Sequence, residues 1–127
     1  MTFRHLAAAA LTAAALAVAR PADAQEPNCR DPKSQMEMNH CAHRAYRAAD
    51  AQLNTVYRGV RARLGPQRRE LLRLSQTAWI AFRDRECRFQ AAEAEGGSMA
   101  PMLLAGCMET LTRERIRHLR SEGQHSG

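Results

Sequence analysis

The stretch SQMEMNHCAHRAYRAADAQLNTVYRGVRARLGP, residues 34–66, decides the fold of this chain. It opens with Ser34 and, three residues later, Glu37, which is the spacing of a helix capping box. Gly65-Pro66 closes it, as expected where one helix ends and another begins. Between these signals, apolar residues recur at steps of three and four, which places them on one face of a helix of about 30 residues. They are Met38, Cys41 or Ala42, Ala45, Ala49, Leu53, Val56, Val60 and Leu64.

Two further helices are predicted after Gly65. The second runs from about Pro66 to about Ala92, and the third follows a break at Gly96-Gly97-Ser98. The second helix has an apolar line that we expect to face inward: Leu71, Leu74, Ala78, Phe82 and Phe89, with Leu72, Ser75 and Trp79 beside it. The third carries Leu103, Leu104, Cys107, Met108, Leu111, Ile116 and Leu119. With no alternating strand pattern after the leader, the sequence predicts an all-α fold, an antiparallel helical hairpin plus a third helix.

A hairpin that turns at Gly65 brings residues whose numbers sum to about 130 to the same height, because both helices rise about 1.5 Å per residue. Asp50 and Arg83 fall at matching levels, and so do Asn54 or Tyr57 and Gln76. We therefore predict an interhelical network that pairs Asp50 with Arg83, and Asn54 with Gln76 or the Tyr57 hydroxyl. Such networks fix helix register more than they add net stability.

The first 24 residues have the parts of a secretory signal peptide. Arg4 precedes an apolar run from Leu6 to Ala19, and Ala22-Asp23-Ala24 supplies small residues at the cut. The run is shorter than the roughly 20 apolar residues that span a bilayer. We expect cleavage near Ala24, a periplasmic or secreted protein, and no transmembrane segment in the mature chain. Residues 25–120 would form a single domain, and residues 121–127 a frayed tail.

Four cysteines follow the leader: Cys29, Cys41, Cys87 and Cys107. In an oxidising compartment they indicate two disulfides. Cys87 and Cys107 lie about equally far on either side of the double glycine, and the segment with Cys29 can fold back along the first helix to Cys41. We favour Cys29–Cys41 and Cys87–Cys107; the alternative is Cys41–Cys87 with Cys29–Cys107.

The full chain of 127 residues carries a net charge of +6, and Lys33 is its only lysine. An arginine-rich surface favours acidic partners such as peptidoglycan, other anionic envelope polymers or a carboxylate-lined cleft. The candidate surface lies at the end of the hairpin and consists of Arg58, Arg61, Arg63, Arg68, Arg69 and Arg73. Export and the lack of a recognition motif argue against nucleic acid as a partner.

Catalytic and metal sites have little support in the sequence. No serine has an evident partner histidine, so we expect no enzymatic activity and no cofactor. Met36, Met38, His40, Cys41 and His43 superficially resemble a soft-metal site. However, Cys41 is expected to be oxidised and the two methionines point to different sides, so no metal is expected.

Three blocks of sequence resemble the LprI-type lysozyme-inhibitor family. The first is Cys41 followed by Ala49 to Tyr57, with Asp50, Leu53 and Asn54. The second runs from Leu72 to Cys87 and contains Gln76, Trp79 and Arg83-Asp84. The third is Gly96-Gly97-Ser98 followed by Cys107, Thr110-Leu111, Arg113 and Leu119. Together they extend from Cys29 to about Leu119.

The resemblance implies a small helical, disulfide-bonded exported protein, some of whose relatives inhibit lysozyme. Inhibition would occur by occlusion, with a protruding segment entering the glycan cleft, whose catalytic groups are carboxylates. An arginine can pair bidentately with a carboxylate. The candidate segments are the turn around Gly96, Gly97 and Ser98 and the hairpin end at Arg68 and Arg69. The alternative is an envelope-binding module that holds peptidoglycan, an anionic polymer or a partner protein.

Overall fold

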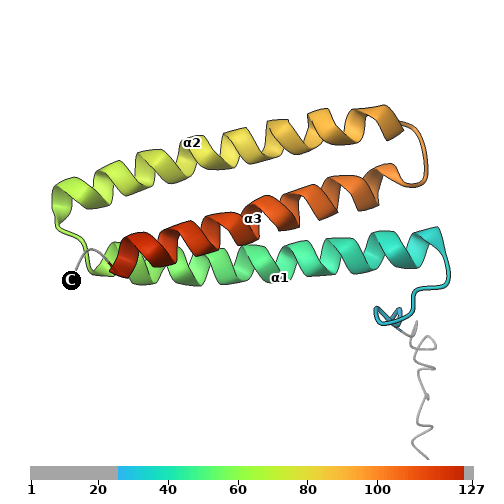
Figure 1. Cartoon of the computed structure of the whole chain (residues 1–127), viewed down its shortest axis with the longest axis horizontal. Helices are drawn as coiled ribbons and strands as arrows, with labels where there is room; N and C mark the ends of the chain where they lie inside the picture. Colours follow the sequence, from blue (N-terminus) through green and yellow to red (C-terminus); the bar gives the residue numbers. More distant parts are fainter. Residues whose placement is uncertain (1–25, 125–127) are drawn as a thin grey trace, which may run out of the picture.

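The computed structural model describes residues 26–124, which form three long helices and a short 3₁₀ helix. These are α1 (Gln35–Ala62), α2 (Pro66–Ala91), η1 (Ala92–Ala94) and α3 (Ala100–Gln124). The long helices run nearly side by side, and α3 contacts both α1 and α2 along the molecule (Figure 1). The all-α prediction is confirmed for the described residues. The predicted signal peptide lies outside them.

The boundaries of α1 follow the local signals in its sequence. The Ser34 hydroxyl accepts a hydrogen bond from the backbone N–H of Glu37 at 3.2 Å. The Glu37 carboxylate in turn accepts from the backbone N–H of Lys33. Gly65 is the N-cap of α2 and Pro66 is its first residue, a position where proline's missing N–H costs nothing.

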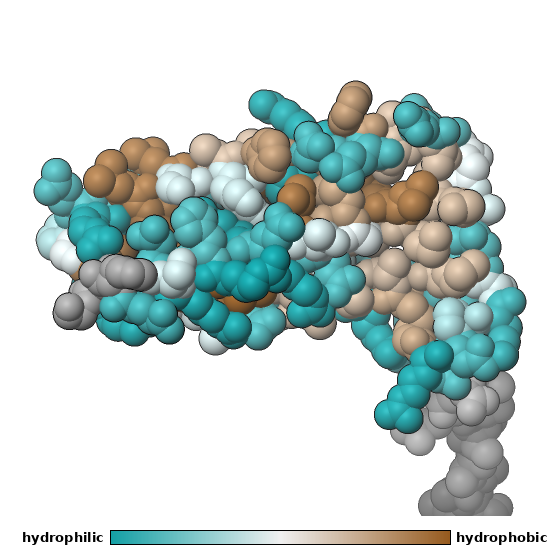
Figure 2. Space-filling model, viewed as in Figure 1, coloured by the Kyte–Doolittle hydropathy of each residue, from teal (hydrophilic) through white to brown (hydrophobic). Residues whose placement is uncertain are grey.

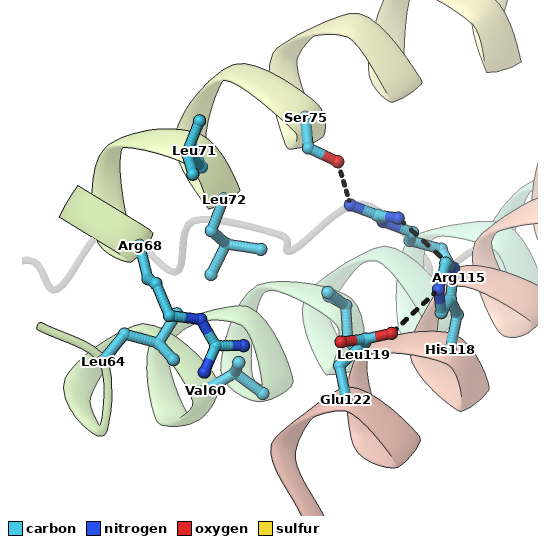
Figure 3. A pocket seen from close by; sticks show the side chains of 10 residues that line it. All are labelled: Val60, Leu64, Arg68, Leu71, Leu72, Ser75, Arg115, His118, Leu119 and Glu122. Atoms are coloured by element: carbon cyan, nitrogen blue, oxygen red, sulfur yellow. Dashed lines mark hydrogen bonds and ion pairs between the residues drawn. The ribbon is translucent and has the colours of Figure 1, made fainter. Parts of the chain in front are cut away.

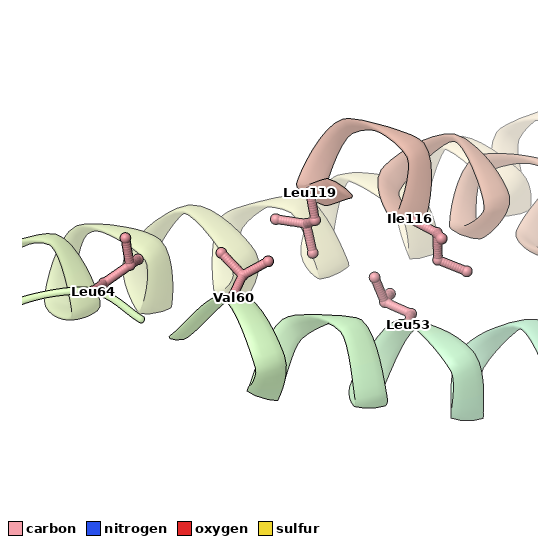
Figure 4. Close-up of a cluster of buried hydrophobic side chains, with 5 residues drawn as sticks. All are labelled: Leu53, Val60, Leu64, Ile116 and Leu119. Carbon is pink, nitrogen blue, oxygen red and sulfur yellow. The ribbon is translucent and has the colours of Figure 1, made fainter. Parts of the chain in front are cut away.

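The apolar core lies between α1 and α3 (Figure 4). Its members are Leu53, Val60, Leu64, Ile116 and Leu119, all less than a tenth exposed. The buried residues of α1 belong to the predicted apolar stripe, so that stripe is confirmed as the inner face.

The predicted apolar line of α2 does not face inward, although Leu72 and Trp79 beside it do pack against the core. Leu71, Leu74, Phe82 and Phe89 are 58%, 51%, 53% and 75% exposed, and Ala78 is also exposed. The residues of α2 that are buried lie on a different side of the helix: Gln76, Arg83, Cys87 and Ala91. This side faces α3, to which Cys87 is covalently joined. The disulfide and the buried polar groups, rather than the apolar line, therefore set the rotation of α2.

The C-terminal end of α3 also differs from the prediction. The tail was expected to begin at residue 121, but α3 continues to Gln124. Gly123 is buried, and a Cβ atom at this position would lie 3.3 Å from Val60 Cγ2. The missing side chain thus lets the last turn of α3 pack closely on α1, which keeps this segment helical.

Both disulfides have the favoured pairing, and the alternative pairing is wrong. Cys29–Cys41 ties the segment before α1 to that helix, with 5.4 Å between the Cα atoms. Cys87–Cys107 joins α2 to α3, with a Cα–Cα distance of 5.5 Å. A native disulfide typically stabilises a small domain by roughly 2–4 kcal/mol.

The orientation of α2 can be tested by comparing Leu53→Ala with Phe89→Ala. Leu53 is 1% exposed and Phe89 is 75% exposed. We expect the first change to lower the free energy of unfolding by about 2–5 kcal/mol. The second should change it by no more than about 0.5 kcal/mol, as for an ordinary surface position. Urea denaturation of dilute oxidised protein measures both values. Equal losses would mean that α2 presents its apolar line to the core.

Candidate functional site

Two buried arginines occupy the region between the helices. Arg83 comes from α2 and Arg115 from α3, and they are 5% and 8% exposed. A buried cation is strongly unfavourable unless charges or hydrogen bonds compensate for lost water. The partners of these two side chains therefore decide what this region does.

Arg83 connects all three long helices. Its Nη1 donates to Asp50 Oδ1 on α1 at 3.1 Å and to Thr112 Oγ1 on α3 at 3.3 Å. Its Nε donates to Asp84 Oδ1 at 3.0 Å. The predicted Asp50–Arg83 pair is thus present. Burial acts to lower the pKa of Arg83, but the hydrogen bonds to Asp84 and Asp50 and nearby negative charge outweigh it and raise that pKa.

Arg115 is held mainly by neutral groups. Its Nε donates to Gln76 Oε1 and its Nη2 to Ser75 Oγ, each at 3.0 Å, and Nη1 lies 3.5 Å from His118 Nδ1. Burial lowers the pKa of Arg115, and the negative charge of Glu122 opposes this effect. The contacts of Arg115 fix α3 to α2.

Trp79 lies within cation–π distance of both arginines. The guanidinium carbons of Arg83 and Arg115 are 5.2 Å and 5.8 Å from the centre of its ring, and Arg83 is also 5.4 Å from the Tyr46 ring. Aromatic faces attract cations and offset part of their desolvation. We call Arg83, Arg115 and the side chains that contact them the arginine cluster. Trp79 is a half-buried part of this cluster rather than an exposed anchor for a partner.

The predicted partner of Asn54 is wrong. Asn54 is exposed, and the side-chain oxygen of Gln76 accepts from Arg115 instead. Tyr57 is half-buried and packs against the apolar core. The prediction failed because α3 packs along both other helices, so α2 turns Gln76 toward α3 rather than toward α1.

Sequence reasoning missed Arg115 and Thr112, although a signal for Arg115 was present. Cys107, Leu111 and Leu119 are separated by multiples of four residues, and Arg115 falls at the missing step. Residues four apart share a helix face. If this face packs against the rest of the protein, Arg115 has to be buried with it. A charged residue inside an apolar line is thus a sign of a buried polar cluster.

The turn after η1 is held against the start of α1. Gly96 has a φ of 79°, a conformation that favours glycine. The backbone N–H of Gly97 donates to Ala94 O at 2.9 Å, and a Cβ atom at Gly97 would lie 3.1 Å from that oxygen. The side chain of Asn39 donates to Ser98 O at 2.9 Å. This candidate contact segment is therefore a tight, anchored turn.

The hairpin end carries the other candidate segment. Arg69 Nε donates to the backbone oxygen of Arg61 at 3.2 Å, which ties the start of α2 to the end of α1. Arg68 lines a pocket of about 300 Å³ whose floor contains apolar side chains from all three long helices (Figure 3). The pocket is lined by Val60, Leu64, Arg68, Leu71, Leu72, Ser75, Arg115, His118, Leu119 and Glu122.

The two candidate segments lie at opposite ends of the molecule (Figure 1). The 26 residues of α2 separate them by about 39 Å at a rise of 1.5 Å per residue. The two segments therefore cannot enter one cleft together, so a single partner cleft has to engage one end or the other.

Over residues 26–124, no group of three or more histidine, cysteine or acidic side chains is arranged to hold a metal ion. Cys41, part of the soft-metal cluster considered from the sequence, is in a disulfide. Within the same described part of the chain, no helix is both long and apolar enough to cross a membrane.

The fold and these contacts define a small, disulfide-bonded helical protein with a central polar cluster that links its three long helices. The model of the family described as lysozyme inhibitor LprI matches residues 28–119, and the chain belongs to that family. An uncharacterised protein of Rhizobium meliloti strain 1021 is 43% identical over 129 aligned positions, which cover 90% of this chain and 93% of the relative. No solved structure matches the chain significantly.

The arginine cluster predicts a rank order of stability losses. Arg83→Ala removes the shared partner of two carboxylates and a threonine, and we expect a loss of about 3–5 kcal/mol, as when one partner of a buried pair is removed. Asp50→Ala leaves Arg83 paired with Asp84, so the loss should be about 1–3 kcal/mol. Chemical denaturation followed by circular dichroism measures both. Equal losses would show that Asp50 alone carries the interaction.

Proposed function

We propose that this protein inhibits lysozyme by inserting the α1–α2 end of the molecule into the glycan cleft of the enzyme. Membership of the lysozyme inhibitor family supports the target. The observation that carries the choice of segment is Arg68, an exposed cation at the tip of the molecule. In this proposal the protein has no catalytic role and needs no cofactor.

The availability of Arg68 distinguishes it from Arg63, Arg69 and Arg73. Arg69 donates to Arg61 O, Arg73 pairs with Glu70 at 2.6 Å, and Arg63 donates to Gly59 O at 3.2 Å. Within residues 26–124, Arg68 makes no hydrogen bond or ion pair. It can therefore pair with a carboxylate of a partner without breaking an existing contact, and arginine can do so bidentately.

Charge also favours this end over the α2–α3 turn. The catalytic groups of a glycan-cleaving cleft are a pair of carboxylates, which an arginine complements. The turn around Gly96 carries Glu95, and the carboxylates of such a cleft would repel its negative charge. In addition, Asn39 holds this turn against α1, which limits how far it can enter a cleft.

The proposed location is the periplasm or the cell exterior, after cleavage of the leader near Ala24. Lysozyme acts on the cell wall, so its inhibitor has to lie outside the cytoplasm. The two disulfides support this location because such bonds persist in oxidising compartments.

A cell-envelope binding module is the second candidate function. It rests on the same end of the molecule, where Arg58, Arg61, Arg63, Arg68 and Arg69 are exposed. A positive surface of this kind attracts peptidoglycan and other anionic polymers, with a strength that falls as salt is added. We prefer lysozyme inhibition because two observations support it: membership of the inhibitor family and the unpaired guanidinium of Arg68.

The decisive experiment is an inhibition assay of the oxidised mature protein against c-type, g-type and i-type lysozymes at low and physiological salt. We expect stoichiometric inhibition of at least one class. Arg68→Ala should weaken it by about tenfold to a hundredfold, the equivalent of one charged hydrogen bond. The matched control is Arg47→Ala, which removes an exposed arginine from the middle of α1. It should leave inhibition unchanged.

Three other outcomes would contradict parts of the proposal. Unchanged inhibition by Arg68→Ala, with a loss in Met99→Ala, would move the contact to the α2–α3 turn, where Met99 is 46% exposed. Equal losses in Arg68→Ala and Arg47→Ala would indicate only general charge attraction. No inhibition of any class, with salt-sensitive retention on purified peptidoglycan, would favour the envelope-binding module.

A further inference from the structure

An apolar strip on α2 is left uncovered by the rest of the protein. We define the α2 strip as Leu71, Leu74, Ala78, Phe82 and Phe89, all of them exposed. At 3.6 residues per turn these positions fall within about 80° of one another around the helix. Brown and tan residues accordingly recur along the upper edge of the molecule, over α2 (Figure 2). The exposed Arg85 falls within the same arc and interrupts the strip between Phe82 and Phe89. Clustered exposed apolar side chains of this kind mark an interaction site.

We propose that the α2 strip binds the same strip of a second copy of this chain, with the two α2 helices antiparallel about a two-fold axis near Ala78. In this arrangement residues whose numbers sum to about 156 lie at the same height. Ala78 faces Ala78, and its small side chain allows the helices to approach closely. Leu74 faces Phe82 of the partner on both sides of the axis, which buries four large apolar side chains near it. Leu71 lies level with the partner's Arg85.

The charges beside the strip favour a second copy over other occupants. One flank carries Arg68 and Glu86, and the other carries Glu70 and Arg88. The two-fold axis places each flank of the strip beside the same flank of the second molecule. Arg68 then lies near the partner's Glu86, and Glu70, which also pairs with Arg73 of its own helix, lies near the partner's Arg88. Each pair occurs twice. Opposite charges that face each other across the helix pair favour this arrangement.

The second copy fits without disturbing the fold. The opposite side of α2, with Gln76, Arg83 and Cys87, faces α3 and is already buried. An anionic lipid surface is the competing occupant, because α2 also carries the exposed arginines Arg68, Arg69, Arg73, Arg85 and Arg88. The opposite charges that pair across the two-fold axis favour the second copy, and binding to anionic vesicles tests the alternative.

The size of the strip sets the expected strength of the contact. It extends about 27 Å from Leu71 to Phe89 and is one helix wide. This is at the small end of specific interfaces, so the dimer should be reversible and should dissociate on dilution.

Analytical ultracentrifugation of the oxidised mature protein over a concentration series tests the proposal. We expect a monomer–dimer equilibrium. Glu70→Arg should weaken the dimer at least tenfold, because it places an arginine near the partner's Arg88. The double variant Glu70→Arg/Arg88→Glu should restore it. The control Glu114→Arg makes the same charge change at an exposed position of α3 and should have no effect. In the dimer Arg68 lies near the partner's Glu86, so the monomer released on dilution is the species whose Arg68 can enter a lysozyme cleft. The variants leave Arg68 itself unchanged, so the dimer and the lysozyme proposal are tested separately.

A cysteine at the proposed axis gives a second test, because a disulfide traps the dimer covalently even when the non-covalent contact is weak. Ala78→Cys should form a disulfide-linked dimer under mild oxidation, while Ala48→Cys on the exposed side of α1 should not. A monomer at every concentration, or equal cross-linking at both positions, would overturn the proposal. So would a double variant that stays as weak as Glu70→Arg. Binding to anionic vesicles that is lost in Phe82→Glu, without any dimer, would identify a lipid surface as the occupant instead.

Discussion

The buried guanidinium of Arg83 is the constraint on which the rest of the structure depends. It can remain charged in the interior only while Asp50, Asp84 and Thr112 accept its hydrogen bonds. These three groups come from three different helices, so satisfying one cation positions α1, α2 and α3 together. Trp79 adds an aromatic face that the same cation needs. A network of this kind specifies helix register because any slip leaves a buried charge unpaired.

The rotation of α2 follows from this constraint. The side of α2 that is buried is the one that carries Arg83, Gln76 and Cys87, and it is directed at α3. The Cys87–Cys107 disulfide fixes the same face covalently. The apolar side is then left in water, which would be unfavourable in an isolated monomer. The exposed strip and the internal arginine cluster are thus two consequences of one packing arrangement.

The arrangement also separates structural from functional residues. The sequence blocks shared with the inhibitor family contain Asp50, Gln76, Trp79 and Arg83, and the structure uses all four in its interior. Their contacts within the molecule hold the three helices together. This explains how family membership can be read from core residues while the contact with a target is decided elsewhere.

The sequence by itself determined the three helices, the capping of α1 by Ser34 and the all-α class, because caps, breaks and apolar periodicity are local properties. It also supported the Cys87–Cys107 pairing and the Asp50–Arg83 pair, since distance along two antiparallel helices can be counted from the turn. Only the tertiary structure decided that α2 buries the side with Gln76 and Arg83, that Gln76 pairs with Arg115 and not with Asn54, and that α3 extends to Gln124. Each of these depends on where α3 packs, and that position balances burial, charge and hydrogen bonding among residues far apart in the chain.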